Sequence, residues 1–219
     1  MSRFPLGRTA RIAVLASGRG SNLEALLRAF PCDPRDGGAL GAVRLVLSNR
    51  EGAPALAKAR AAGAEARYIA YDRREAFDAE AIAALEDVDA DLVCLAGFMR
   101  ILSPSFVRRF RGRLLNIHPS LLPAHRGLHA QRQALEAGDR RSGCTVHFVD
   151  EGVDTGRVVV QRDVPILPGD TEESLAERIR VQEHRAFPEA VRLVLTGEIT
   201  ADGATAEGRG SRGSAGVHG

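Results

Sequence analysis

Two polar residues, Asn116 and His118, stand two positions apart where an apolar run ends, in the stretch LLNIHPSLLP. Residues i and i+2 of a strand point to the same side of a sheet, so their side chains should lie together. An amide can donate a hydrogen bond to a developing oxyanion, and an imidazole can donate or transfer a proton. Pro119 and Pro123 prevent regular pairing in the loop that follows. The pair could serve catalysis, or it could merely satisfy the backbone of this loop.

A third candidate is Asp154, in the stretch DEGVDTG between two apolar runs. An aspartate beside glycines is commonly a turn residue. The functional alternative is that this loop brings the carboxylate against His118. There it would raise the pKa of the imidazole and fix the orientation of the ring. Spacing along the chain does not decide between these two roles.

The stretch SGRGSN lies between an apolar run and a helical pattern. Free backbone N–H groups and the positive helix end make such a turn an anion site. A dinucleotide fingerprint would require glycine where Leu23 stands, and an acidic residue where the chain reads SNR after the second apolar run. The pattern therefore favours a small phosphate held by Gly20, Ser21 and Asn22 over a nicotinamide nucleotide. The alternative is a tight turn with no ligand.

The remaining histidines and cysteines do not form a metal motif. His147 lies inside a strand-like run, and His125 and His129 flank the proline-containing loop. Neither HExxH nor a Cys/His zinc spacing occurs, so we expect no metal. Cys94 and Cys144 lie in apolar runs and are expected to be small core residues.

The elements that must position these residues alternate along the chain. Short apolar runs predict strands at 12–16, 43–47, 66–70, 91–96 and 114–117. Helical patterns predict helices at 23–30, 54–62, 75–86 and 104–110. This alternation predicts an α/β fold with a mostly parallel twisted sheet, helices on both faces and a Rossmann-like N-terminal half. Asn116 and His118 then stand at the carboxyl end of a strand, where such sheets bind ligands.

The alternation of strands and helices ends in the C-terminal half. A helical pattern at 128–137 precedes two strand-like runs, at 143–150 and 156–164, with a short loop at 151–155. These runs predict an antiparallel hairpin appended to the parallel sheet. Thr171 is expected to cap a long helix that ends near Leu195.

Composition limits the class of protein. The chain has 219 residues, of which 30 are basic and 28 acidic, for a net charge of +2, so no nucleic-acid partner is expected. A signal-like start and a run of 18 apolar residues are both missing, so we expect a cytoplasmic protein without a membrane partner. We expect one domain over 1–200, with a nucleotide-binding-like half at about 11–110 and a catalytic half at about 111–200. The segment 201–219 is rich in Gly, Ala, Ser and Arg and is expected to be disordered.

Taken together, these motifs resemble those of phosphoribosylglycinamide formyltransferases, the folate-dependent enzymes of purine synthesis. The resemblance runs from about Arg11 to about Leu195 and rests on SGRGSNLEAL, LAGFMRILS, LLNIHPSLLP, GCTVHFVDEGVDTG and QEH. It implies transfer of a formyl group from 10-formyltetrahydrofolate to the amine of glycinamide ribonucleotide through a tetrahedral intermediate, without a metal. The stretch AHRG after Pro123 departs from the aromatic- and Pro-containing version of relatives. Such a protein would be a monomer or a homodimer.

The resemblance also implies roles for individual residues. The catalytic residues would be Asn116, His118 and Asp154. The ribonucleotide would be bound by Gly20, Ser21, Asn22 and Glu183. The C-terminal half would bind the folate, a co-substrate, as well as carry catalysis. The residues that contact the folate would be Arg74, Met99, Arg100, Ile101, Leu102 and Asn116.

Three other functions compete with this one. A formyltetrahydrofolate deformylase uses the same catalytic trio but carries an additional N-terminal regulatory domain, whereas few residues precede the first strand here. Formyltransferases that act on methionyl-tRNA or nucleotide sugars carry a C-terminal domain of substantial size. A non-catalytic nucleotide-binding module would not need Asn116, His118 and Asp154 together.

Overall fold

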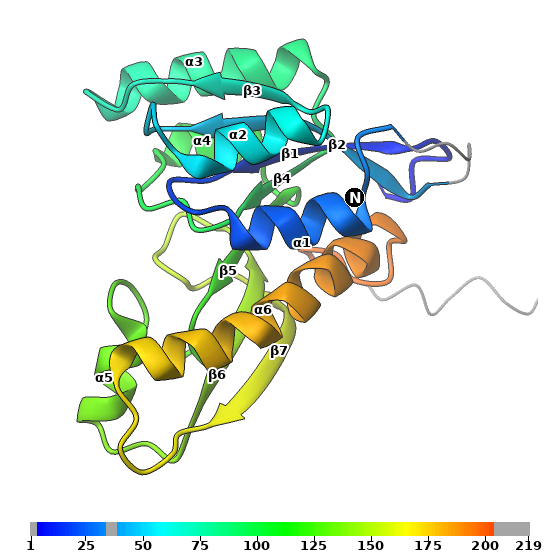
Figure 1. The fold of residues 1–219 in the computed structure, drawn as a ribbon. Coiled ribbons are helices and arrows are strands. Elements are labelled where there is room, and N and C mark those ends of the chain that lie inside the picture. Colours follow the sequence, from blue (N-terminus) through cyan, green and yellow to red (C-terminus); the bar gives the residue numbers. More distant parts are fainter. Residues whose placement is uncertain (1–3, 34–38, 204–219) are drawn as a thin grey trace, which may run out of the picture.

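A computed structural model describes residues 4–33 and 39–203, which fold around one seven-stranded sheet in the order β3-β2-β1-β4-β5-β6-β7 (Figure 1). The strands are β1 (Ala10–Leu15), β2 (Gly41–Ser48), β3 (Glu65–Tyr68), β4 (Leu92–Leu95), β5 (Leu114–His118), β6 (Arg141–Phe148) and β7 (Val158–Pro165). The strands β1 to β5 run parallel, whereas β6 is antiparallel to β5 and β7 to β6. The predicted parallel sheet with an appended antiparallel hairpin is confirmed.

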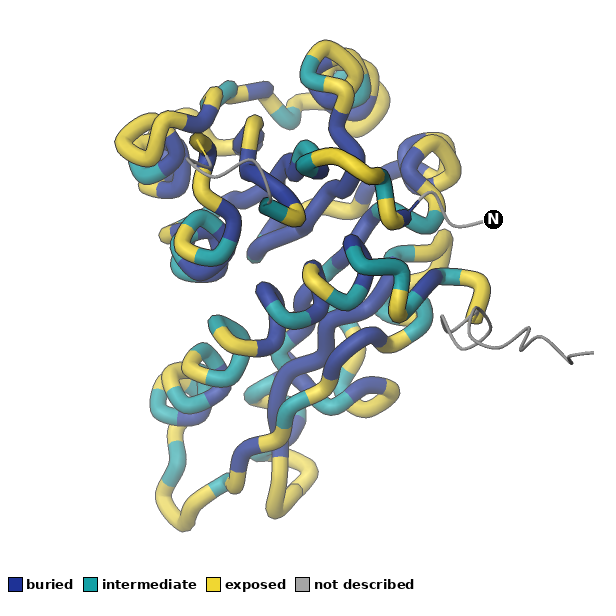
Figure 2. The backbone as a smooth tube through the Cα atoms, turned by 90° about the vertical axis from the view of Figure 1, so that its right-hand side faces the viewer, coloured by how far each residue is buried: buried dark blue, intermediate teal, exposed yellow. Residues whose placement is uncertain are grey.

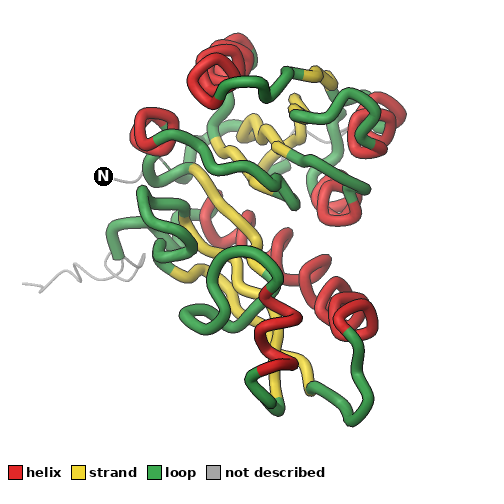
Figure 3. The backbone as a smooth tube through the Cα atoms, turned by 90° about the vertical axis from the view of Figure 1, so that its left-hand side faces the viewer, coloured by secondary structure: helices red, strands yellow, loops and turns green. Residues whose placement is uncertain are grey.

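Helices cover both faces of the sheet (Figure 3). They are α1 (Ser21–Ala29), α2 (Pro54–Ala61), α3 (Arg74–Asp87), α4 (Pro104–Arg109), α5 (Ala130–Glu136) and α6 (Glu172–Leu195). Alternate residues of β1 enter two separate cores: Ile12 and Val14 pack on the side of α1 and α6, and Ala13 and Leu15 on the side of α3 and α4. The central strands are therefore buried on both faces, which explains why their sequences are continuously apolar (Figure 2).

The hairpin differs from the prediction in the length of its loop. Its strands end at Phe148 and resume at Val158, so the predicted loop at 151–155 was too short. Next to the loop, the Phe148 N–H donates to the Arg157 carbonyl (2.8 Å), and the Val149 N–H, which points to the other side of β6, donates to the Leu114 carbonyl on β5 (2.9 Å). The Asp150 carboxylate then accepts from the Gly152 N–H (3.1 Å) and the Thr155 hydroxyl (2.6 Å). This local turn shapes the loop that carries Asp154.

The long helix α6 ties the two halves of the molecule together. Its predicted cap is confirmed, because the Thr171 hydroxyl accepts the Ser174 N–H (3.3 Å) and the Ser174 hydroxyl accepts the Thr171 N–H (3.0 Å). The helix packs on β6 and β7 and lies beside α1 (Figure 1). The chain then continues beyond Thr200, with Ala201 packed against the core. Most of the tail predicted to be disordered, from 204 onward, lies outside the described residues.

Other details refine the prediction. Cys94 and Cys144 are fully buried in β4 and β6, as expected for core residues. The helix expected at 128–137 is shorter, because His129 adopts a left-handed conformation (φ 58°) and α5 begins only after it.

Candidate active site

The three residues singled out in the sequence lie together. Asn116 and His118 stand at the carboxyl end of β5, and the loop after β6 brings Asp154 against both. The Asn116 amide nitrogen lies 3.4 Å from Asp154 Oδ1, and His118 Nδ1 lies 3.3 Å from Asp154 Oδ2. The His118 side chain is 6% exposed and that of Asp154 12%. The expected contact between the hairpin carboxylate and His118 is therefore present.

Asp154 is held by groups from three segments. Besides His118, its carboxylate accepts the Gly127 N–H (2.9 Å) and lies 3.4 Å from His147 Nε2. Burial alone would raise the pKa of Asp154, but the bonds from His147 and Gly127 and the nearby imidazoles together lower it. Asp154 also has a left-handed backbone (φ 52°), so it is a turn residue as well as a partner of His118. The two alternatives raised by the sequence both apply.

The pKa of His118 is shifted in the opposite direction to the one expected from a carboxylate alone. A carboxylate was expected to raise the pKa of this imidazole, and Asp154 does act in that direction. Burial acts more strongly, and the net effect is a pKa below the usual value. Because Nε2 donates to the His125 carbonyl (2.8 Å), Nδ1 carries a proton only in the imidazolium form. Asp154 thus faces the ring nitrogen that gains a proton when His118 becomes charged.

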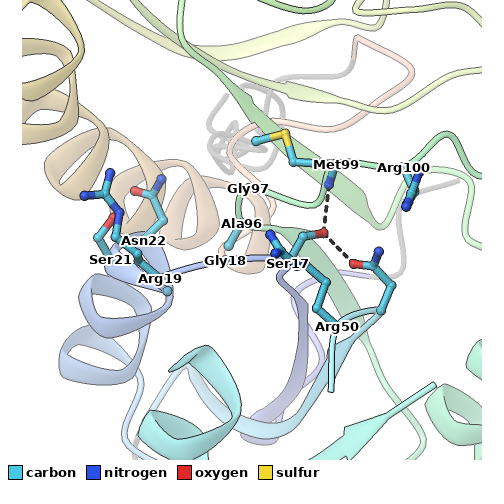
Figure 4. Close-up of a pocket in the computed structure, with 12 residues that line it drawn as sticks. Ser17, Gly18, Arg19, Ser21, Asn22, Arg50, Ala96, Gly97, Met99 and Arg100 are labelled. Carbon is cyan, nitrogen blue, oxygen red and sulfur yellow. Dashed lines mark hydrogen bonds between the residues drawn. The ribbon is translucent and has the colours of Figure 1, made fainter. Parts of the chain in front are cut away.

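A cavity of about 680 Å³ opens at the carboxyl ends of β1, β2 and β4 (Figure 4). The loop after β1 lines it from Ser17 to Asn22, and Met99 lines it from the loop after β4. Its lining includes Arg19, Arg50 and Arg100, and no carboxylate among the described residues that line it. The cavity is therefore suited to an anionic ligand.

The glycine loop leads directly into α1. Gly20 has a positive φ of 74°, and the first turn of α1 receives no side-chain cap from the described residues. Its N–H groups are thus oriented as in a helix-terminal anion site. The Asn22 amide donates to Glu183 of α6 (2.8 Å), while its Oδ1 is buried with no hydrogen-bond partner among the described residues. Burial raises the pKa of Glu183 despite the bond from Asn22.

The segment expected to bind folate combines exposed apolar side chains with a buried anchor. Met99 and Ile101 are 66% and 67% exposed, whereas Leu102 is buried in the core on the α3 side. The Arg100 guanidinium stacks over the Tyr71 ring, 4.9 Å from its centroid, and the Tyr71 hydroxyl donates to the Ile101 carbonyl (2.9 Å). Exposed apolar groups of this kind can cover an aromatic ligand.

Arg74, the remaining residue expected in the folate site, is exposed at the start of α3. Its guanidinium lies 3.4 Å from the Glu75 carboxylate. A weak, exposed pair of this kind leaves Arg74 able to exchange its partner for a ligand carboxylate.

Comparison with known proteins assigns the chain to a family. Residues 10–191 match the model of the formyl transferase family. The chain belongs to the formyl transferase family. It is 46% identical to the phosphoribosylglycinamide formyltransferase of Escherichia coli (strain K12), over 86% of this chain and 88% of that protein. The solved structure of glycinamide ribonucleotide transformylase 1 from Symbiobacterium toebii superimposes with a TM-score of 0.81 at 47% identity, covering 88% of this chain and 90% of that one.

Some relatives of this formyl transferase chain are much longer. The trifunctional purine biosynthetic protein adenosine-3 of Drosophila melanogaster is 54% identical over 87% of this chain. The matched region spans only 14% of the length of that protein.

Sequence reasoning missed three residues that lie at this candidate site or line the cavity. His147 was expected to be an ordinary strand residue, yet its Nε2 lies 3.2 Å from the Asn116 amide nitrogen. Its place follows from the register, because His147 pairs with Asn116 across β5 and β6. Ser17 and Asn49, at the ends of β1 and β2, also line the cavity. Their positions directly after buried strands were the available signal.

Two further observations bear on ligands and membranes. Within residues 4–33 and 39–203, no group of three His, Cys, Asp or Glu side chains is arranged to hold a metal ion. Over the same part of the chain, no helix is both long enough and apolar enough to cross a membrane.

Proposed function

We propose that this protein transfers a formyl group from 10-formyltetrahydrofolate to the amine of glycinamide ribonucleotide, a step of purine biosynthesis in the cytoplasm. The observation that carries the proposal is the cluster of Asn116, His118 and Asp154, found in a chain of the formyl transferase family. The similarity to the Escherichia coli phosphoribosylglycinamide formyltransferase, over most of both chains, supports this choice of substrates.

The chemistry requires no covalent bond to the protein. The glycinamide nitrogen attacks the formyl carbon, and the carbonyl oxygen becomes an oxyanion in a tetrahedral intermediate. Collapse of this intermediate breaks the bond between the formyl carbon and N10 of the folate, and the proton lost by the amine is delivered to N10. The protein must hold two ligands in line, stabilise the oxyanion and move one proton.

The trio is suited to these tasks. The bonds that the Asn116 amide makes to His147 and Asp154 are long, 3.2 and 3.4 Å, so the amide can turn to an oxyanion at little cost. Burial lowers the pKa of His118 and so favours the neutral imidazole, which can accept a proton as the amine attacks. Asp154 then stabilises the imidazolium, because it faces the nitrogen that gains the proton.

The cavity is suited to the ribonucleotide and the folate. The uncapped start of α1 and the Arg19 guanidinium suit the ribose phosphate, with Asn22 and Glu183 nearby. Met99 and Ile101 offer apolar surface to the pteridine or aminobenzoyl part of the folate, and the exposed Arg74 offers charge to its glutamate carboxylates. Both ligands would then meet near the end of β5.

The test is an assay of the purified protein with both substrates. We expect formylglycinamide ribonucleotide and tetrahydrofolate in equal amounts, and no turnover with either substrate alone. Release of formate without the amine would instead identify a deformylase. Retained binding of both ligands without any reaction would identify a non-catalytic binding module.

A further inference from the structure

Ser17 connects parts of the site that come from three different strands (Figure 4). It follows β1, directly before the glycine loop, and is only 4% exposed. Its hydroxyl donates to Asn49 Oδ1 (2.6 Å), after β2, and accepts the Met99 N–H (2.9 Å), after β4. Its own N–H donates to the Gly97 carbonyl (3.1 Å). One buried residue is thus bonded to each of the other segments that line the cavity.

The donors in this network determine its direction. The Met99 N–H can only donate, so it occupies a lone pair of Ser17 and leaves the single hydroxyl hydrogen for Asn49. Asn49 must then present its carbonyl oxygen to Ser17 and turn its NH₂ group away from it. Because Asn49 also lines the cavity, Ser17 fixes the orientation of an amide that borders the ligand space.

Glycines make such a side-chain bond necessary. Gly18 follows Ser17 directly, and Gly20 and Gly97 both have positive φ angles, 74° and 72°. Glycine allows a wide range of φ and ψ angles, so these segments need other contacts to hold one conformation. The spacing between the glycine loop and the segment after β4 must therefore be set by bonds between them, and Ser17 supplies two of these bonds.

We propose that Ser17 is a positioning residue for formyl transfer, an inference that rests on the function proposed above. It holds the glycine loop, which would bind the ribonucleotide phosphate, at a set distance from Met99 in the segment that would bind folate. Direct transfer depends on this distance, because the attacking nitrogen and the formyl carbon come from different ligands. A misplacement of about 1 Å can cost on the order of 10²-fold in rate.

The Ser17→Ala variant tests the proposal. With both substrates saturating, we expect kcat to fall about 10- to 100-fold, as for reactants held out of line. The dissociation constant of each ligand, measured alone by calorimetry, should change by less than about threefold, because each binding segment remains intact. A residue that only supported the fold would lower the melting temperature without this separation of turnover from binding. Ser17→Thr keeps the hydroxyl and should recover part of the lost turnover.

Ser142→Ala is the matched control. Ser142 is a serine of β6 that is equally buried, at 2% exposure, and its hydroxyl has no hydrogen-bond partner among the described residues. Removing that hydroxyl should leave kcat close to the wild-type value. A comparable loss in Ser142→Ala would show that any buried serine is sensitive, and would overturn the specific role of Ser17.

Asn49→Ala approaches the same network from its other side, and it carries the test if the Ser17 variants do not fold. The double variant should be no slower than the slower single variant, because both changes disrupt one unit. Turnover of Ser17→Ala within about twofold of wild type, or additive losses in the double variant, would overturn the inference while the proposed function stands. Lack of formyl transfer by the wild-type protein would overturn both.

Discussion

At the scale of the residue, Asp154 combines two demands that the sequence presented as alternatives. Its left-handed backbone suits the turn, and its carboxylate contacts His118. A change to asparagine separates the two, because asparagine also tolerates this conformation but carries no charge. We expect Asp154→Asn to lower the pKa of His118 further and to reduce kcat by about 10²–10³, because the imidazolium formed during transfer loses its counter-charge. Proton NMR titration of His118 and steady-state kinetics measure these effects.

Asp150→Asn is the control for this prediction. Asp150 belongs to the same loop, and its Oδ1 accepts from Gly152 and Thr155. Asparagine keeps that oxygen and removes the charge, so turnover should stay close to wild type. An equal loss in both variants would show that loop shape, and not the charge beside His118, is responsible.

The glycine loop offers a second prediction at this scale. A Cβ at Gly20 would lie 2.9 Å from Ala55 Cβ, and the residue has a φ of 74°, so Gly20→Ala should cost about 1–3 kcal/mol of stability. A Cβ at Gly18 would meet no atom of the described structure within 4 Å, so Gly18→Ala should change stability by less than about 0.5 kcal/mol. Denaturant unfolding of the two variants distinguishes a glycine required by packing from one that only borders the cavity.

The proximity of Asn116 and His118 was predictable from the period of a strand, whereas the sequence left the place of Asp154 open and only the resemblance implied a catalytic role for all three. Asn116 and His118 had to share one side of β5, and the motif around them is specific. The direction of the His118 pKa shift was not predictable, because burial opposes the carboxylate and its extent depends on the whole fold. The place of His147 needed the register between β5 and β6, which local sequence does not supply.

At the scale of the element, types were predicted more reliably than ends. Strands and helices followed from apolar periodicity, but the hairpin loop was longer than predicted, and the Asp150 carboxylate forms a local turn with Gly152 and Thr155 within it. The cap of α6 was predictable, since Thr171 begins a capping box whose partners are local in sequence.

That cap can be tested by itself. Thr171→Ala removes the oxygen that accepts the Ser174 N–H and should cost about 0.5–2 kcal/mol of stability. Thr171→Ser keeps the hydroxyl and should cost much less. Activity at 25 °C should persist in both, because Glu183 lies in the middle of α6, far from the frayed end. Urea unfolding with an unchanged m value provides the measurement, and a loss of activity without a loss of stability would contradict it.

At the scale of the whole molecule, the site depends on contacts between distant segments. The helix α6 brings Glu183 to Asn22 of α1, and β1, β2 and β4 meet through Ser17. Sequence patterns predicted each segment but not these junctions. Burial at such junctions leaves polar groups in poorly solvated surroundings, which changes their proton affinity.

The buried His118 and the half-buried His184 should make stability depend on pH. Burial lowers the pKa of His118, and burial together with Arg28 and Arg180 lowers that of His184. The unfolded chain titrates histidine near its usual value of about 6.5, so the unfolded state binds protons first as the pH falls. The free energy of unfolding should therefore decrease as the pH drops from about 7.5 through 6.5, until the native histidines are also protonated.

His184→Gln isolates one of these contributions, because glutamine does not titrate. Between the native pKa of His184 and the usual histidine pKa, the wild-type unfolded state binds up to one more proton than the native state. Removing that difference should reduce the slope of the unfolding free energy against pH by up to about 1.4 kcal/mol per pH unit. Glu183 acts oppositely in more acidic solution, because its raised pKa means that the native state takes up the proton first. Unfolding curves of His184→Gln and of the wild type, collected from pH 7.5 to 5.5, isolate the contribution of His184, because Glu183 is present in both. An unchanged slope in His184→Gln would mean that His184 has nearly the same proton affinity in the native and unfolded chains.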